Sequence, residues 1–156
     1  MWLLSLLLAL VCVVDTTDDR RELLARAVAQ YAEPLGARID ARTLDVAWAD
    51  LNGDGLDDGL VRLSLRGGGW TVLVFEAMPP EDAVEVGPFL PAAEIRAVYG
   101  PLVIVPRANG WCDIVATAAR GTYRRLRFDG ETYPPRTSLG TLVRQLPTGQ
   151  VVFRTR

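Results

Sequence analysis

After Arg42 the apolar residues occur at every second position or in short runs, and this pattern constrains the fold more than any other feature of the chain. Between Val61 and Arg66 they alternate with polar residues, which predicts a strand with one buried face and one face in water. Short apolar runs bounded by Gly and Pro continue to the end of the sequence, as is typical of an antiparallel sheet. The further strands that we expect span residues 71–75, 95–99, 102–105, 114–118, 123–128 and 151–154.

A helix is predicted before these strands, over residues 18–32. Leu24, Val28 and Tyr31 recur at helical spacing, and this apolar face is expected to pack on the sheet. Thr16 and the acidic residues after it have the spacing of a capping box. The helix should end before Pro34, because a residue that precedes proline avoids the helical conformation.

The connections between strands complete the predicted fold. The glycines at 67–69 indicate a turn rather than a phosphate-binding loop, since no helix follows them. Residues 78–91, rich in proline and acids, indicate an irregular surface connection, and 129–130 and 148–149 indicate hairpin turns. No fixed period recurs, which excludes a propeller. We therefore expect one α+β domain, with an N-terminal helix on a mainly antiparallel sheet of about six to eight strands.

The first residues indicate a leader. Residues 2–14 are apolar and uncharged, about the length of an export-signal core, although a buried helix or a short membrane anchor would share this composition. Cys12 makes a lipoprotein-type leader with a lipid anchor a further alternative, but Val11 is larger than the residue such processing prefers. The sequence thus predicts a leader at 1–14, a domain at 15–156, and a periplasmic or secreted location, with membrane contact only through the leader or a lipid on Cys12.

The basic residues restrict the chemistry. All 17 are Arg, and the chain has no His. This composition excludes His-based nucleophile activation, His-ligated zinc, Schiff-base lysines and P-loop lysines. An enzyme would have to use a carboxylate pair, a Tyr, a bound metal or a Cys. We do not expect this protein to be an enzyme. The net charge of −2 gives no reason to expect nucleic-acid binding.

One acidic loop, residues 50–58, carries the only metal-binding pattern in the sequence. A Ca²⁺ loop takes ligands from the side chains at its first, third, fifth and ninth positions and from the carbonyl of the seventh. Here the four side chains are Asp50, Asn52, Asp54 and Asp58, and the carbonyl is that of Leu56. The intervening glycines allow the backbone to curl round an ion. Val61 occupies the twelfth position, so the bidentate Glu of an EF-hand is missing.

Without that ligand the predicted Ca²⁺ site is weak, with a dissociation constant of roughly 10⁻⁴ to 10⁻³ M. Water or Asp57 would complete the ligand set. The alternative is a metal-free turn, because Asp, Asn and Gly are also the ordinary residues of turns. We favour the metal, since a turn does not require four such side chains in this register.

Two other groups of residues suggest function less strongly. The arginines at 120, 124, 125 and 127, near two aromatic residues, could bind a polyanion, but a solvated strand face is the favoured interpretation. Cys112 could be a reactive thiol, but neither Lys nor His is available to lower its pKa, so a small buried apolar residue is favoured. Among the remaining carboxylates, including Glu76, no spacing singles out an acid and base pair.

The acidic loop also carries a family resemblance. The sequence ADLNGDGLDD at 49–58 resembles the D-x-N-G-D-G-x-x-D loop of FG-GAP and VCBS-type repeats of bacterial secreted and surface proteins, here in a single copy. The whole chain is similar to a group of uncharacterised bacterial periplasmic proteins and lipoproteins, through GWTVLVF at 69–75, GWCDIV at 110–115 and LRFDGETYP at 126–134. That group often has two cysteines beside the glycine-rich turn, and this chain has none there. The resemblance implies the same five ion ligands and no catalytic activity.

Together these patterns predict an exported, non-enzymatic envelope protein with a structural calcium loop and an unidentified ligand or partner. One alternative is an envelope hydrolase that uses carboxylates or the bound metal, which should have a concave pocket that gathers two or more acids away from the loop. Another is an inhibitor of a secreted enzyme.

Overall fold

The structure is a computed structural model that describes residues 17–33, 44–64, 69–108 and 110–153. The predicted leader at 1–14, with Cys12, lies outside the described residues, as does most of the glycine turn at 67–69. Within the described ranges, neither α-helix has the length and apolar character needed to cross a membrane.

The described chain forms two α-helices, two short 3₁₀ helices and two antiparallel sheets. The helices are α1 (Thr17–Ala32), α2 (Pro80–Val86), η2 (Ala119–Gly121) and η3 (Thr137–Leu139). The first sheet, in the order β1-β2-β3-β4, contains β1 (Asp45–Ala49), β2 (Asp58–Ser64), β3 (Trp70–Ala77) and β4 (Phe89–Val98). The second, in the order β8-β7-β6-β5-β9, contains β5 (Leu102–Val105), β6 (Asp113–Thr117), β7 (Tyr123–Leu126), β8 (Thr141–Val143) and β9 (Gln150–Val152).

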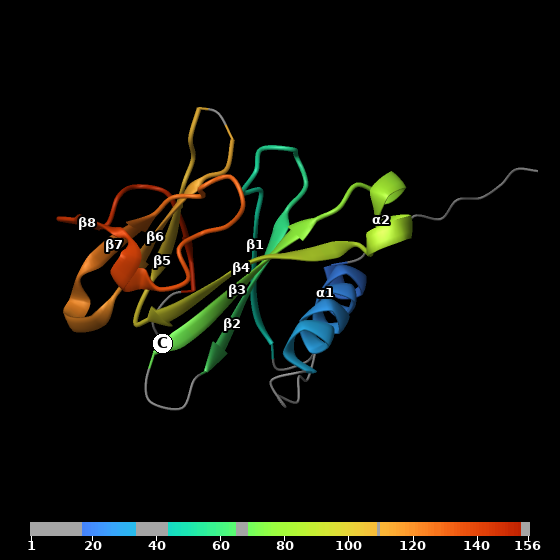
Figure 1. Ribbon diagram of the computed structural model, residues 1–156, viewed down its shortest axis with the longest axis horizontal. Helices are drawn as coiled ribbons and strands as arrows, with labels where there is room; N and C mark the ends of the chain where they lie inside the picture. Colours follow the sequence, from blue (N-terminus) through green and yellow to red (C-terminus); the bar gives the residue numbers. More distant parts are fainter. Residues whose placement is uncertain (1–16, 34–43, 65–68, 109, 154–156) are drawn as a thin grey trace, which may run out of the picture.

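These elements form three layers, with the first sheet in the middle. Figure 1 shows α1 against one face of that sheet and the second sheet against the other. Neither sheet closes on itself in the described chain. The predicted α+β class, with one N-terminal helix on antiparallel strands and no propeller, is therefore confirmed.

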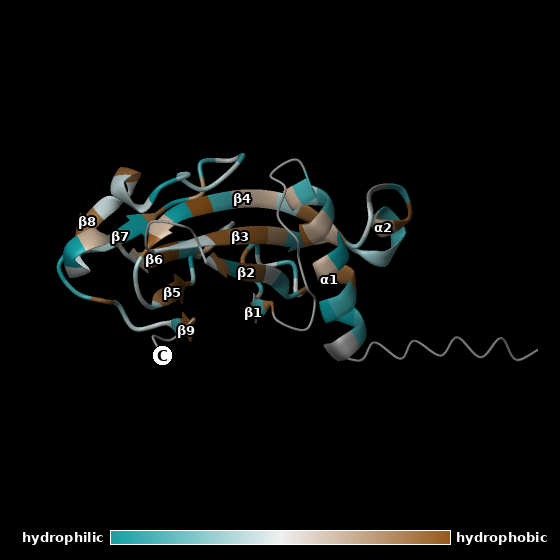
Figure 2. Ribbon diagram, turned by 90° about the horizontal axis from the view of Figure 1, so that it is seen from below, coloured by the Kyte–Doolittle hydropathy of each residue, from teal (hydrophilic) through white to brown (hydrophobic). Residues whose placement is uncertain are grey.

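Side-chain alternation on the central strands β2 and β3 builds two cores. Leu60 and Val74 face the second sheet, in a cluster that also contains Ile114 and Leu126. Val61, Leu73 and Phe75 face the other way, in a cluster with Leu24 and Val28 of α1. Both faces of these strands are thus buried, which explains the apolar colouring of the middle layer in Figure 2.

Helix α1 confirms the prediction for residues 18–32 and packs closely on the sheet. Leu24 is fully buried and lies over Gly59, where an added Cβ would come within 2.7 Å of a Leu24 methyl carbon. Gly59 therefore allows the close approach of helix and strand. Tyr31 donates a hydrogen bond to Glu94 of β4 at 3.0 Å, which ties the helix to the edge strand.

The prediction for residues 78–91 is wrong, because α2 and the start of β4 lie there. Pro80 occupies the beginning of α2, where proline loses no hydrogen bond, and Glu81 and Asp82 follow in the first turn. Pro91 is accommodated in β4 because this strand lies at the edge of its sheet. Strands β1 and β8 also lie outside the predicted set.

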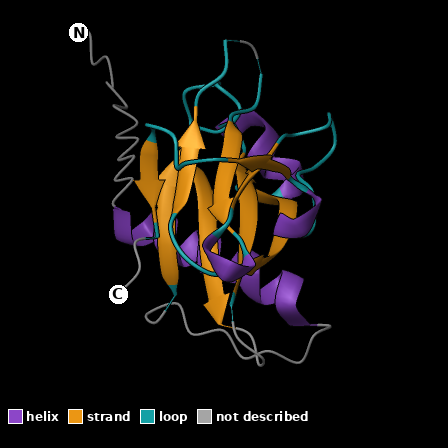
Figure 3. Cartoon of the chain, turned by 90° about the vertical axis from the view of Figure 1, so that its left-hand side faces the viewer, coloured by secondary structure: helices purple, strands orange, loops and turns teal. Residues whose placement is uncertain are grey.

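The hairpin predicted at residues 148–149 is wrong as well. Strands β8 and β9 lie at opposite edges of the second sheet, so the segment 144–149 between them crosses one of its faces. At the end of this segment, an added Cβ on Gly149 would lie 2.7 Å from Cγ1 of Val103, and Figure 3 shows loops in front of the strands on this side of the molecule. Asp129 and Gly130 do form a turn, in which the N–H of Thr132 donates to Asp129 Oδ1, but it lies within the long 127–140 connection from β7 to β8 and closes no tight hairpin.

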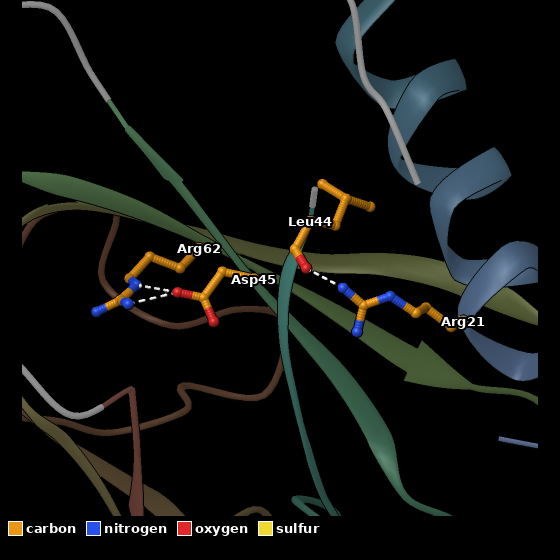
Figure 4. A network of polar contacts seen from close by, with 4 residues as sticks. All are labelled: Arg21, Leu44, Asp45 and Arg62. Atoms are coloured by element: carbon orange, nitrogen blue, oxygen red, sulfur yellow. Dashed lines mark hydrogen bonds and ion pairs between the residues drawn. The ribbon is translucent and has the colours of Figure 1, made fainter. Parts of the chain in front are cut away.

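An ion pair lies inside the β1–β2 ladder. Asp45 is directly opposite Arg62, whose Nε donates to its carboxylate at 2.8 Å (Figure 4). The guanidinium lies over the rings of Trp70 and Phe153, 4.5 and 5.1 Å from their centroids. Figure 4 also shows Arg21 of α1 donating to the carbonyl of Leu44, just before β1.

Candidate metal centre

The acidic loop joins β1 to β2 at one end of the middle sheet, in teal in Figure 1. Its ends are held together because Ala49 and Asp58 form the last pair of the ladder. The loop also reaches the second sheet, since Cys112 donates its backbone N–H to the carbonyl of Leu51 at 2.6 Å. The loop therefore lies at the joint between the two sheets.

Asp50 organises the first half of the loop. Its carboxylate oxygens accept the backbone N–H groups of Gly53, at 2.7 Å, and of Gly55, at 3.0 Å. Both glycines have positive φ, 81° and 88°, a conformation that residues with a side chain rarely adopt. The two glycines thus turn the chain back so that their N–H groups point at the first predicted ligand.

Asn52 and Asp54 continue the pattern in steps of two residues. The side-chain carbonyl of Asn52 accepts the N–H of Asp54 at 3.0 Å, and Asp54 accepts the N–H of Leu56 at 2.7 Å. The amide of Asn52 also donates to the second oxygen of Asp54 at 2.9 Å. A carboxylate has about four lone-pair sites, so these bonds leave acceptor capacity on Asp50 and Asp54.

Asp58, the fourth side chain of the predicted set, is turned into the protein. It is fully buried, and its two oxygens accept the N–H groups of Leu51 and Ala77, each at 2.9 Å. Burial raises the pKa of Asp58 from 3.8 to about 7, and the negative charges of Asp54 and Glu76 act in the same direction. Asp58 thus connects the loop to the end of β3.

Leu56 and Asp57 hold the second half of the loop against the helix. Leu56 is half-buried and packs on the core beneath α1. The backbone carbonyl of Asp57 accepts a hydrogen bond from Arg20 of α1 at 2.8 Å, and the Arg20 guanidinium lies over Trp48. The backbone next to the predicted carbonyl ligand is therefore anchored.

Glu76 joins the site from β3, which the spacing of the sequence did not reveal. Its carboxylate accepts a hydrogen bond from the Asn52 amide at 3.1 Å. Pairing of Gly59 with Phe75 places Glu76 next to the base of the loop. The only sequence signal was a polar residue at the end of an otherwise apolar strand, and its meaning depends on which strands pair.

The candidate ligand atoms of the loop are of the type that calcium prefers, because all are hard oxygen atoms. The structure brings Asp50, Asn52 and Asp54 together through the hydrogen bonds above and directs Asp58 to the backbone of β3. Over the described ranges, no group of three or more His, Cys, Asp or Glu side chains is arranged to hold a metal ion. If the loop bound calcium, the ligands that remain from the predicted set would be Asp50, Asn52, Asp54 and the Leu56 carbonyl. Asp58 would instead fix the base of the loop to β3.

Two hollows lie near the loop and α1. The first, of ≈ 250 Å³, has mainly apolar walls, and Asp57 is its one acidic residue; it is lined among others by Arg20, Leu23, Met78 and Phe89. The second, of ≈ 190 Å³, is formed by α1 alone and contains Asp19 and Glu22. Glu22 is exposed and forms an ion pair with Arg26 at 2.7 Å.

Cys112 and Tyr133 lie behind the loop. The Cys112 thiol is buried, which raises its pKa, and its sulfur lies 3.7 Å from the carbonyl oxygen of Asp50. Tyr133 is fully buried and donates its hydroxyl to the Cys112 carbonyl at 2.7 Å. This environment agrees with the favoured interpretation of Cys112 as a buried apolar residue.

Compared with known proteins, the chain matches no family model, no curated protein and no solved structure.

Proposed function

We propose that the acidic loop is a weak structural Ca²⁺ site in an exported, non-catalytic domain. The observation that carries this proposal is the set of hydrogen bonds from Gly53 and Gly55 to Asp50, and from Asp54 to Asn52. These bonds order oxygen-bearing side chains on one short loop whose sequence spacing is that of Ca²⁺-loop ligands. A simple turn between two strands needs fewer of them.

The place of the loop gives the site its role. The Leu51 carbonyl is bonded to the second sheet, Asp58 is bonded to β3, and the Asp57 carbonyl is bonded to α1. An ion held by Asp50, Asn52 and Asp54 would neutralise carboxylates that otherwise repel one another, and so stabilise a loop that is bonded to all three layers. Such a site stabilises the fold and needs no substrate.

The low affinity expected of a loop without a bidentate Glu agrees with a location outside the cytoplasm. Sites of this class have dissociation constants of roughly 10⁻⁴ to 10⁻³ M and fill where calcium is plentiful.

A thermal melt of the whole chain tests the proposal. At 5 mM CaCl₂, about five to fifty times the expected dissociation constant, binding should raise the melting midpoint by several degrees over the value in chelator. The double variant Asp50→Asn with Asp54→Asn should lose this shift, whereas Asp82→Asn on α2 should retain it. An unchanged wild-type midpoint at several millimolar Ca²⁺ would overturn the proposal, and equal shifts with Mg²⁺ would overturn its assignment to calcium.

A further inference from the structure

Asp113 is the centre of a second charged cluster, on the second sheet and apart from the acidic loop. Its side chain is buried, yet three arginines surround it. Nε of Arg107 lies 3.9 Å from Oδ1, and Nε of Arg125 and of Arg127 each lie 3.7 Å from Oδ2. We call these four residues the Asp113 cluster.

The sheet register explains why the four residues meet. Ile114 lies opposite Leu126, and both face the core between the sheets. Their neighbours Asp113, Arg125 and Arg127 therefore point to the outer face. Arg107 comes from the chain after β5, whose last residue pairs with Asp113.

The charges of the cluster do not balance. Three guanidinium groups face one carboxylate, which leaves an excess of two positive charges. The contacts are longer than hydrogen bonds, and Oδ1 of Asp113 is buried without a hydrogen-bond partner. One arginine in bidentate contact is enough to pair a carboxylate such as Asp113. A salt bridge therefore does not explain why three arginines lie around it.

The donors of these arginines are also unused. In the described part of the chain, no hydrogen bond from the side chains of Arg107, Arg125 or Arg127 is formed. Their side chains are 43%, 32% and 65% exposed, whereas that of Asp113 is 6% exposed, so part of each arginine side chain is accessible to solvent. Three guanidinium groups with unused donors thus lie around one carboxylate on the outer face.

We propose that the Asp113 cluster binds a dianionic tetrahedral oxyanion, a phosphate or sulfate group. Such a group supplies the two negative charges that the cluster lacks, and its oxygens match the planar fork of donors on each guanidinium. Asp113 is the positioning residue, because its buried carboxylate keeps three mutually repelling arginines together before the anion arrives. Free phosphate and a phosphate-bearing lipid headgroup present the same chemistry.

The test is a titration of the whole chain with inorganic phosphate at constant ionic strength, followed by the Nε–Hε resonances of the arginines. The resonances of Arg107, Arg125 and Arg127 should shift saturably. Arg107→Gln and Arg127→Gln, which change exposed side chains, should each weaken binding by about tenfold, because each removes a charged donor. Arg120→Gln is the matched control, since it changes an exposed arginine at the opposite end of the β6–β7 hairpin.

A second arm identifies the source of the phosphate group. Phosphatidylcholine vesicles with and without phosphatidic acid are sedimented with wild-type and Arg127→Gln protein. Retention by the acidic vesicles alone, lost in the variant, would assign the site to a headgroup, whereas a phosphate shift without retention would assign it to free phosphate. Two results would overturn the proposal: no saturable shift of the three resonances, or an equal loss of phosphate binding in Arg120→Gln.

Discussion

Asp58 accepts the backbone N–H of Ala77 at 2.9 Å, so a residue of the acidic loop binds β3 just beyond the last β2–β3 pair, Gly59 with Phe75. Its other oxygen accepts the N–H of Leu51. Asp58→Ala should lower the free energy of unfolding by about 2 to 4 kcal/mol, because two buried N–H groups lose their acceptor. Urea unfolding in chelator measures this loss. Asp57→Ala changes an exposed neighbour and should cost less than about 0.5 kcal/mol; equal losses would contradict the role given to Asp58.

The same carboxyl group should make stability depend on pH. The pKa of Asp58 is about 7 in the folded chain, above its ordinary value of 3.8, so the folded protein binds the proton more tightly between these values. Its contribution to the free energy of unfolding should therefore fall as the pH rises from about 4 to about 7, and level off above that. The measurement is the difference between wild type and Asp58→Asn over this window in chelator. A difference that stays constant with pH would refute the prediction.

The hydroxyl of Tyr133 should contribute to stability through a single hydrogen bond. Tyr133→Phe leaves the buried carbonyl of Cys112 without its donor, at a cost of about 1 to 2 kcal/mol. Chemical unfolding of the variant gives this value. Tyr123→Phe, in a half-buried side chain of β7, serves as the control and should remain within about 0.5 kcal/mol of wild type.

The thiol of Cys112 should react only when the protein opens. It is 8% exposed, and burial raises its pKa, so the reactive thiolate is scarce in the folded state. In a Cys12→Ser background, labelling with a thiol reagent should be slow in buffer and should accelerate with urea. Labelling in buffer as fast as that of an unfolded peptide would mean that the thiol is accessible in the folded chain.

The stem of Arg62 should matter more than its charge. Its side chain is 7% exposed between the rings of Trp70 and Phe153, whereas that of Asp45 is 40% exposed and can be solvated. Arg62→Ala removes the packing and should cost about 2 to 4 kcal/mol, while Arg62→Met keeps most of it and should cost about 1 kcal/mol. Guanidinium unfolding followed by tryptophan fluorescence compares the two. Equal costs would show that the charge dominates.

Local patterns were enough to predict the helix and most strands. The spacing of Leu24 and Val28 predicted α1, and the apolar run 102–105 matches β5. The sequence also contained the signals for α2, in Pro80 and the acids after it, but the prolines of that stretch outweighed them. Strand β8 pairs with β7 through three residues, and a strand this short has no pattern to detect.

Contacts between distant residues decided the rest of the candidate site. Spacing placed Asp58 with the loop side chains, but the position of Ala77 in β3 turns its carboxylate inward. Glu76 and Arg107 become relevant only once the strands are paired. Sequence reasoning could single out the polar residues of the loop, but it could not establish which of them face the protein interior.

The hydrogen bond from Gly53 to Asp50 also affects the chemical lifetime of the loop. An asparagine followed by glycine loses its amide when the glycine nitrogen attacks the side-chain carbon, and Asn52 precedes Gly53. In the folded loop that nitrogen is engaged with Asp50, and the Asn52 side chain is held by Asp54. Order in the loop thus slows deamidation, whereas each opening exposes Asn52 to a covalent change that persists after the loop has closed.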